Sequence, residues 1–234
     1  MGMIPIGDDN LAGGPPPLVN WALIALNVAA FFLELSQPSE RALQSFITAW
    51  GVVPREYSSG HDIAPLIPLP FWSTLITSMF LHGGWMHLGG NMLYLWIFGD
   101  NLEKVMGHVR FLVFYLLCGV AAAFAHIAFN AGSNVPTVGA SGAISGVLGG
   151  YLVLFPRNRV YVMSYGGVSA VPAVLMLGFW ILLQFVNGFG AVAATPETGG
   201  VAYLAHIGGF IAGAVLAPLF SVGRRRDALI DTRV

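Results

Sequence analysis

Charged residues are scarce in this 234-residue chain, because only 9% of it is Asp, Glu, Lys or Arg while 56% is hydrophobic. A soluble domain carries about 25% charged residues, so this chain has too little charge to cover a soluble surface. The formal net charge of −1 also argues against nucleic acid as a partner, since that partner requires a basic surface. The composition therefore predicts an all-α, polytopic membrane protein surrounded by lipid.

Cysteine occurs once, at Cys118, which excludes an internal disulfide and a zinc site built on cysteines. The His-Glu-x-x-His helix of zinc proteases is absent as well, so neither a metal nor a cofactor is expected. Lys and Arg are missing before the first apolar run, where Asp8, Asp9 and the prolines Pro15 to Pro17 stand instead. A cleavable signal peptide is therefore not expected.

Long segments without charge define the expected membrane spans. A first run begins near Leu18 and ends at Glu34, and further runs cover residues 63–99, 111–156, 160–196 and 198–223. A helical span needs about 20 apolar residues, so the run 111–156 accommodates two spans with a turn at 130–136. We expect a bundle of six transmembrane helices at about residues 18–36, 84–102, 110–130, 140–156, 168–189 and 201–222.

The span positions predict the domain organisation. Residues 1–17 are expected to form a flexible cytoplasmic tail, residues 18–222 the six-span domain, and residues 223–234 a basic cytoplasmic tail. Within the domain, residues 37–70 form a long extracytoplasmic loop whose amphipathic piece at 46–50 can lie at the membrane interface. This arrangement puts eight Lys and Arg residues on the side of both termini and two opposite. The positive-inside rule therefore predicts cytoplasmic termini.

Ser141 opens a glycine-rich apolar segment, residues 139–150. A helix rises about 1.5 Å per residue, and counting from the cytoplasmic ends of the spans brings Ser141 and three other polar residues to similar depth. They are His206, His87 and Asn91. All four fall in the outer half of a hydrocarbon core about 30 Å thick.

Small residues at every fourth position of two spans permit close helix contact. These positions are Gly142, Gly146 and Gly150 on one span and Ala205, Gly209, Gly213 and Ala217 on the other. If the two stripes face each other, Ser141 and His206 come within reach near the outer end of the spans. The alternative is that the stripes serve helix packing alone.

A serine hydroxyl becomes a good nucleophile when a base takes its proton, and histidine is the usual base. Ser141 is therefore the candidate nucleophile, and His206 is the candidate general base and acid. His87 and Asn91 are four residues apart and share a helix face, so both can donate to an oxyanion together with the backbone N–H of Ser141. We expect no buried Asp or Glu beside His206, which favours a Ser-His dyad over a triad.

Each candidate also has a purely structural interpretation. Ser141 can cap its helix, and His206 can bond a neighbouring carbonyl. His82 is expected at the interface, and His126 is expected to be a structural hydrogen-bonding residue. A second functional class stays open, namely a transporter or channel whose buried His87, His126 and His206 relay protons or bind a small ion. That class predicts repeat symmetry between the halves, which the sequence lacks.

These motifs resemble those of the rhomboid family of intramembrane serine proteases, over about residues 70–220. The segment Gly139-Ala140-Ser141-Gly142 resembles the nucleophile motif of the family. The pair Ala205-His206, followed by Gly208-Gly209, resembles its catalytic-histidine motif. The span-two motif of the family resembles the segment from His82 to Asn91, with His87 and Asn91 at its oxyanion positions and Glu103 where the family carries a structural glutamate.

Two positions depart from the family pattern. A Trp-Arg pair is frequent before span two, and here Trp72 is followed by Ser73. Many members carry a tyrosine four residues after the nucleophile, against which the histidine packs, and here that residue is Ser145. Neither change removes a catalytic group.

The resemblance implies a serine protease that hydrolyses peptide bonds in or near the transmembrane segments of single-span membrane proteins. It also implies that span five, with bulky Phe179, Trp180 and Phe185, is the gate through which substrate enters. The compact six-span form indicates the inner membrane of a bacterium, with the active site opening to the extracytoplasmic side.

Overall fold

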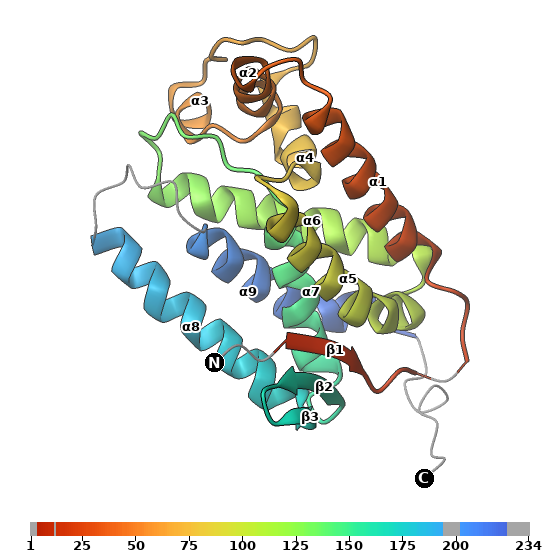
Figure 1. Cartoon of the computed structure of the whole chain (residues 1–234). Helices are drawn as coiled ribbons and strands as arrows, with labels where there is room; N and C mark the ends of the chain where they lie inside the picture. The colour runs from red at the N-terminus through yellow and green to blue at the C-terminus, as the bar shows by residue number, and fades with distance from the viewer. Residues whose placement is uncertain (1–3, 12, 194–201, 224–234) are drawn as a thin grey trace.

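The computed structural model describes residues 4–11, 13–193 and 202–223. Its α-helices are α1 (Leu18–Leu35), α2 (Glu40–Trp50), α3 (Pro54–Ser59), α4 (Thr74–Thr77), α5 (Trp85–Met106), α6 (His108–Phe129), α7 (Ser141–Leu154), α8 (Ala173–Ala193) and α9 (Tyr203–Phe220). Short 3-10 helices at Phe71–Ser73 and Ser78–Phe80 flank α4. The strands β1 (Ile4–Asp8), β2 (Arg159–Ser164) and β3 (Gly167–Pro172) form a small sheet at the opposite end of the molecule from α2 and α3 (Figure 1).

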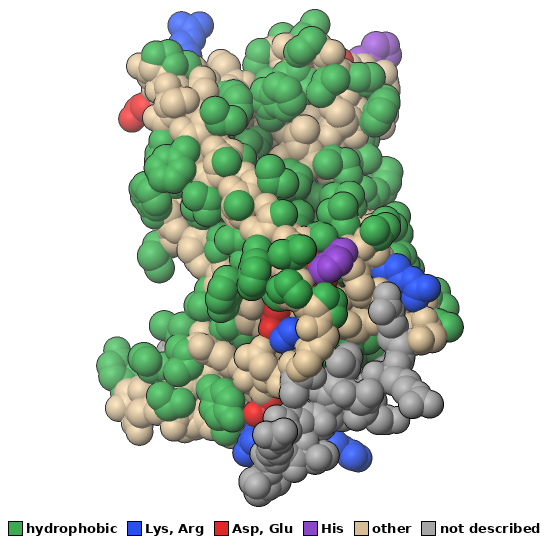
Figure 2. Space-filling model, turned by 90° about the vertical axis from the view of Figure 1, so that its right-hand side faces the viewer, with side chains coloured by type: hydrophobic (Ala, Val, Ile, Leu, Met, Phe, Trp, Pro, Cys, Tyr) green, Lys and Arg blue, Asp and Glu red, His purple; other side chains and the backbone are tan. Residues whose placement is uncertain are grey.

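Three of the described helices, α1, α6 and α9, are long and apolar enough to cross a membrane, and α7 and the Ala173–Gly188 part of α8 are shorter apolar helices. Large hydrophobic side chains on these helices point outward, among them Phe32, Leu117 and Val215. Hydrophobic side chains also cover the middle of the face in Figure 2, whereas most of the Lys and Arg side chains on that face gather toward its lower end. Such a surface is that of an integral membrane protein.

Helix α7 lies in the middle of the helices (Figure 1), and every residue from Gly142 to Tyr151 is buried. Its small-residue stripe faces that of α9, which is the condition under which the sequence pattern brings Ser141 and His206 within reach. A Cβ atom added to Gly209 would lie 2.0 Å from the carbonyl oxygen of Gly142, and one added to Gly213 would lie 1.9 Å from the carbonyl oxygen of Gly146. The two backbones therefore touch directly, which only glycine permits.

The expected span at residues 168–189 begins later in the structure. Residues 167–172 form β3, which pairs with β2 in an antiparallel hairpin, and α8 starts at Ala173. Val160 and Val171 face each other across the hairpin, and β-branched residues favour this pleated geometry. The hairpin was not predicted from the sequence, because buried β-strands and transmembrane helices are both rich in valine.

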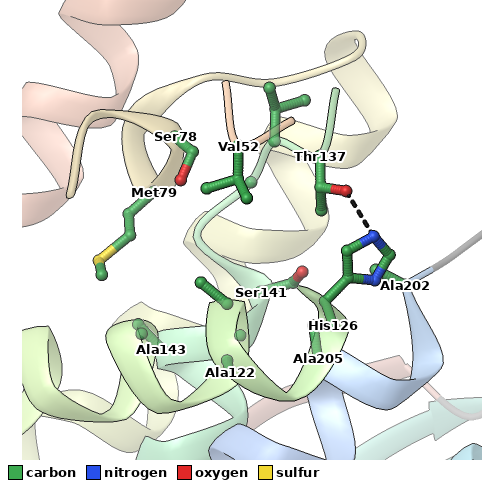
Figure 3. A pocket seen from close by; sticks show the side chains of 15 residues that line it. Val52, Ser78, Met79, Ala122, His126, Thr137, Ser141, Ala143, Ala202 and Ala205 are labelled. Atoms are coloured by element: carbon green, nitrogen blue, oxygen red, sulfur yellow. Dashed lines mark hydrogen bonds between the residues drawn. The ribbon is translucent and has the colours of Figure 1, made fainter. Parts of the chain in front are cut away.

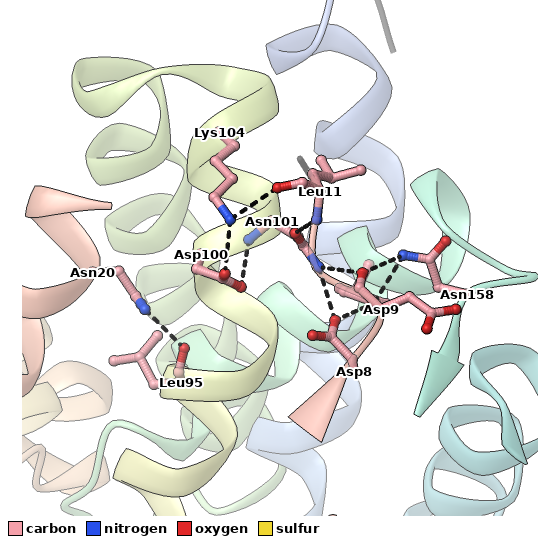
Figure 4. Close-up of polar contacts among 10 residues, drawn as sticks. Asp8, Asp9, Leu11, Asn20, Leu95, Asp100, Asn101, Lys104 and Asn158 are labelled. Atoms are coloured by element: carbon pink, nitrogen blue, oxygen red, sulfur yellow. Dashed lines mark hydrogen bonds and ion pairs between the residues drawn. The ribbon is translucent and has the colours of Figure 1, made fainter. Parts of the chain in front are cut away.

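The N-terminal segment, expected to be a flexible tail, contains β1, which pairs antiparallel with β2. Asp8 accepts a hydrogen bond of 2.8 Å from Nδ2 of Asn101 on α5 and another from the hydroxyl of Tyr151 on α7. Asp9 accepts one of 3.1 Å from Nε of Arg159 on β2. Figure 4 shows Asp8 and Asp9 between α5 and the segment that carries Asn158. These contacts hold β1 against two buried helices.

The long loop 37–70 contains α2 and α3, so its amphipathic piece belongs to a regular helix. Ser39 caps α2 by accepting a hydrogen bond of 3.2 Å from the N–H of Ala42. The loop is bound to the segment before α7, since the N–H of Val52 donates to the carbonyl of Thr137 at 3.0 Å. The basic tail from Arg224 onward lies outside the described residues.

Candidate active site

Ser141 and His206 meet where α7 and α9 begin. The distance between Oγ of Ser141 and Nε2 of His206 is 2.9 Å, although 65 residues separate them in the chain. Ser141 is the first residue of α7 and His206 lies in the first turn of α9. The close contact of the two helices brings both side chains to one place, at the N-terminal end of each helix in the seam of small residues between them.

The hydroxyl of Ser141 does not cap its helix. The residue at the N-cap position of α7 is Ala140, which makes no side-chain cap bond. The first N–H groups of a helix lack partners within it, so the Ser141 N–H stands at a helix start beside its own hydroxyl. Partial positive charge at such an end favours a developing negative charge.

His87 approaches Ser141 across the backbone of Gly139. A Cβ atom added to Gly139 would lie 2.8 Å from both Cε1 and Nε2 of His87 and 3.6 Å from Oγ of Ser141. Nδ1 of His87 accepts a 3.3 Å hydrogen bond from the N–H of Gly83, so Nε2 carries the proton and is a donor. The φ angle of Gly139 is +127°, which side chains rarely adopt.

Asn91 lies on the same helix as His87 and is buried. Its Nδ2 is 2.9 Å from Nε2 of His82. His82 was expected at the interface, but only 1% of it is exposed. Its backbone N–H donates to Oε1 of Glu34 at 2.9 Å. The start of α5 is therefore fixed by α1, and the Asn91 amide is oriented by a histidine that sequence analysis had placed in the interface.

Ser145 takes the place of the tyrosine that was expected to support His206. Its hydroxyl donates to the carbonyl of Ser141 at 2.6 Å. Two residues of α8 stand beside the imidazole instead. Oε1 of Gln184 is 2.8 Å from Nδ1 of His206, and the ring of Trp180 has its centroid 5.9 Å from the imidazole centroid. Gln184 was not predicted from the sequence, because the expected partner of His206 was an acid or an aromatic residue. The four-residue spacing of Trp180 and Gln184 was the available signal.

A small pocket opens beside Ser141 (Figure 3). Small side chains line much of it, including Gly119, Ala122 and Ala143. His126 also lines it, and its Nε2 lies 2.7 Å from Oγ1 of Thr137. His126 thus has the structural hydrogen bond that was expected of it.

Glu103 lies at the other end of α5 and is fully buried. Its carboxylate accepts hydrogen bonds from the N–H groups of Val19 at 2.9 Å and Asn20 at 2.7 Å, and it contacts Nδ1 of His108 at 2.5 Å. A carboxylate is favourable at a helix N-terminus, so Glu103 joins α5 to the start of α1. Among the described residues, no group of three His, Cys, Asp or Glu side chains is arranged to hold a metal ion.

Several rhomboid proteins are similar to this chain in sequence. Rhomboid protease GluP of Bacillus subtilis is 33% identical over 202 residues, which are 86% of this chain and 35% of that protein. Rhomboid protein 1, mitochondrial, of Saccharomyces cerevisiae is 28% identical over 86% of this chain and 52% of its own length. Rhomboid-like protein 11, chloroplastic, of Arabidopsis thaliana is 31% identical over 65% of this chain and 54% of its own.

The chain thus spans between about a third and about half of the length of these curated relatives. The family model described as Rhomboid domain matches residues 70–222, a region that contains α5 to α9 with Ser141, His206, His87 and Asn91. That match covers more than half of the sequence, and the chain therefore belongs to the rhomboid family.

Proposed function

We propose that this protein is an intramembrane serine protease with a Ser141–His206 dyad. The observation that carries the proposal is the 2.9 Å contact between the Ser141 hydroxyl and Nε2 of His206. A serine hydroxyl paired with a histidine base is the arrangement that acyl transfer to serine requires. A transporter or channel would have no use for the hydroxyl in this place.

In the proposed first step, Oγ of Ser141 attacks the carbonyl carbon of the scissile peptide bond while its proton passes to Nε2 of His206. The negative charge on the carbonyl oxygen is met by the backbone N–H of Ser141, by Nε2–H of His87 and by the amide of Asn91. The C–N bond then breaks as His206 returns the proton to the departing nitrogen. An acyl ester on Ser141 remains.

Water completes the proposed cycle. It attacks the ester carbonyl, and one of its protons passes to His206. The bond between the carbonyl carbon and Oγ then breaks, and Ser141 takes the proton back from His206. Each cycle consumes one water and regenerates both side chains.

We also propose the membrane arrangement that sequence analysis predicted. The protein lies in the inner membrane of a bacterium, and both of its termini are cytoplasmic. Six helices cross this membrane, namely α1, α5, α6, α7, α8 and α9. The substrates are single-span membrane proteins cleaved near their extracytoplasmic ends, and α8 is the gate. The six-span domain 18–222 carries all catalytic groups, and the segments 1–17 and 223–234 lie on the cytoplasmic side.

The experiment is cleavage of a model single-span substrate by the purified protein in proteoliposomes. A fluorophosphonate probe measures the reactivity of the serine in the same samples. We expect Ser141→Ala to abolish both cleavage and labelling, and His206→Ala to lower both at least about 1,000-fold, since a serine without its base is a poor nucleophile.

Ser145→Ala is the matched control, because it removes a buried serine hydroxyl one helical turn away that donates to the Ser141 carbonyl. It should retain labelling. Labelling that survives Ser141→Ala, or normal cleavage by His206→Ala, would refute the protease mechanism.

A further inference from the structure

The second ring nitrogen of His206 has a partner on a different helix from Ser141. Nδ1 of His206 lies 2.8 Å from Oε1 of Gln184 on α8. The exposed fractions of the two residues are 9% and 8%, so both side chains are buried. Leaving one of two such buried groups unpaired costs more than the net worth of the hydrogen bond.

The orientation of the Gln184 carboxamide decides which nitrogen of His206 carries the proton. Nε2 of Gln184 lies 3.4 Å from the backbone carbonyl oxygen of Trp180, and a carbonyl oxygen only accepts hydrogen bonds. The NH2 group therefore faces Trp180, and Oε1 faces His206. Because Oε1 also only accepts, the proton of neutral His206 is on Nδ1.

That tautomer leaves the lone pair of Nε2 directed at the Ser141 hydroxyl, 2.9 Å away. The opposite tautomer would put a proton on Nε2 and leave it unable to accept one from Ser141. The contact with Gln184 therefore favours the form of His206 that works as a base.

Trp180 restricts the imidazole from a second direction. Its ring plane is inclined by 34° to the imidazole plane, at a centroid distance of 5.9 Å. Trp180 and Gln184 are four residues apart and share one face of α8. One helix face thus controls both the tautomer of His206 and the space in which its ring can turn.

We propose that Gln184 is a positioning residue that holds His206 in the tautomer able to accept the Ser141 proton. The proposal rests on the proposed protease function. When His206 takes the proton, Nδ1–H still donates to Gln184, so the hydrogen bond persists through the step. A carboxamide does this without placing an ionised side chain among apolar helices, which is costly. Gln184 has the place that an aspartate occupies in a Ser-His-Asp triad.

Two substitutions separate the acceptor from the bulk of the side chain. Gln184→Met keeps the length but removes the carbonyl, whereas Gln184→Glu keeps an acceptor oxygen at the same distance. We expect Gln184→Met to lower kcat for a model single-span substrate roughly 10- to 100-fold with KM unchanged, the scale of one buried donor left unpaired. Gln184→Glu should lose less than Gln184→Met. Leu182→Met, at an outward-facing position of α8 that is 56% exposed, is the matched control and should equal wild type.

A second measurement uses the wild-type protein and does not depend on how any Gln184 variant folds. Nitrogen-15 NMR of histidine-labelled protein distinguishes the two neutral tautomers, and the His206 signal is the one lost in His206→Ala. We expect protonated Nδ1. A protonated Nε2, or a Gln184→Met variant with wild-type kcat, would overturn this inference while cleavage still depends on Ser141 and His206. If cleavage or labelling does not depend on Ser141, the proposed function itself fails.

Discussion

At the scale of single residues, Gly139 determines how closely His87 and Ser141 approach each other. Its φ angle of +127° is unfavourable for any side chain, and a Cβ atom there would lie 2.8 Å from the His87 ring. We expect Gly139→Ala to push His87 and the start of α7 apart. A displacement of about 1 Å at a catalytic centre can cost about 100-fold in rate, so cleavage of a model substrate should fall by that order.

Gly132→Ala is the control for this prediction. Gly132 lies in the same connection between α6 and α7, and a Cβ atom there would meet nothing within 4 Å. Cleavage at the wild-type rate is expected for Gly132→Ala. A Gly139→Ala variant that cleaves equally well would show that the approach of His87 to Ser141 has no part in the reaction.

The contact of Ser141 with His206 was predictable because both residues lie on helices with a stripe of small residues. Two such stripes allow the helices to pack closely against each other. The contact of His206 with Gln184 was not, because a lone glutamine in an apolar span has many structural roles. Its meaning depends on the rotation of α8, which places Oε1 2.8 Å from the imidazole. The sequence alone does not specify that rotation.

At the scale of helices, the seam between α7 and α9 sets the distance between Ser141 and His206, the proposed nucleophile and base. A Cβ atom on Gly213 would lie 1.9 Å from the carbonyl oxygen of Gly146. We expect Gly213→Ala to destabilise the fold by about 1–3 kcal/mol, the usual cost of overpacking. The thermal unfolding midpoint in detergent should fall, and cleavage should weaken because Ser141 and His206 are forced apart.

Gly178→Ala tests whether the effect is specific to the seam. Gly178 lies inside α8 with nothing within 4 Å of an added Cβ atom, and alanine is the better helix former by about 1 kcal/mol. Its midpoint should match or exceed that of wild type. Equal midpoints for Gly213→Ala and Gly178→Ala would contradict direct backbone contact along the seam.

Charge-free runs of sequence predicted where the principal helices lie, because length and apolarity are local properties. The hairpin of β2 and β3 escaped this reasoning, since its valines extend an apolar run and the glycine of its turn, Gly166, occurs in a chain already rich in glycine. The pairing of β1 with β2 escaped it as well. It joins Asp8 to Val160, and such long-range pairing leaves no periodic signal in either segment.

At the scale of the whole molecule, β1 connects the N-terminal segment to α5, to α7 and to the hairpin before α8. The pKa of the Asp8 carboxyl is raised from 3.8 to about 7, chiefly by burial. Hydrogen bonds from Tyr151 and Asn101 oppose this rise, and the neighbouring carboxylates of Asp100 and Asp9 add to it. When β1 is docked, Asp8 therefore keeps its proton up to about pH 7. When β1 is undocked, Asp8 loses that proton near its ordinary pKa of 3.8. The docking of β1 should thus depend on pH.

The direction follows from these two pKa values. Below about pH 4 both states are protonated and docking is strongest. Between there and about pH 7 the docked state binds more protons, so docking weakens by about 1.4 kcal/mol for each pH unit. Above about pH 7 the loss is complete. A spin label on Ile6→Cys, at a position that is 44% exposed, should become more mobile from pH 5.5 to pH 7.5, and buried Cys118 should not take up label.

Asp8→Asn distinguishes this carboxyl from every other group near β1. The carboxamide oxygen can still accept a hydrogen bond from Tyr151, but it does not ionise, so label mobility should stay constant over the same range. Against the effect of partial burial, hydrogen bonds from the backbone and side chain of Arg159 hold the pKa of Asp9 below its ordinary value, so Asp9 stays ionised throughout. A pH response that persists in Asp8→Asn, or none in the labelled protein with Asp8 intact, would show that proton binding at Asp8 does not control the docking of β1.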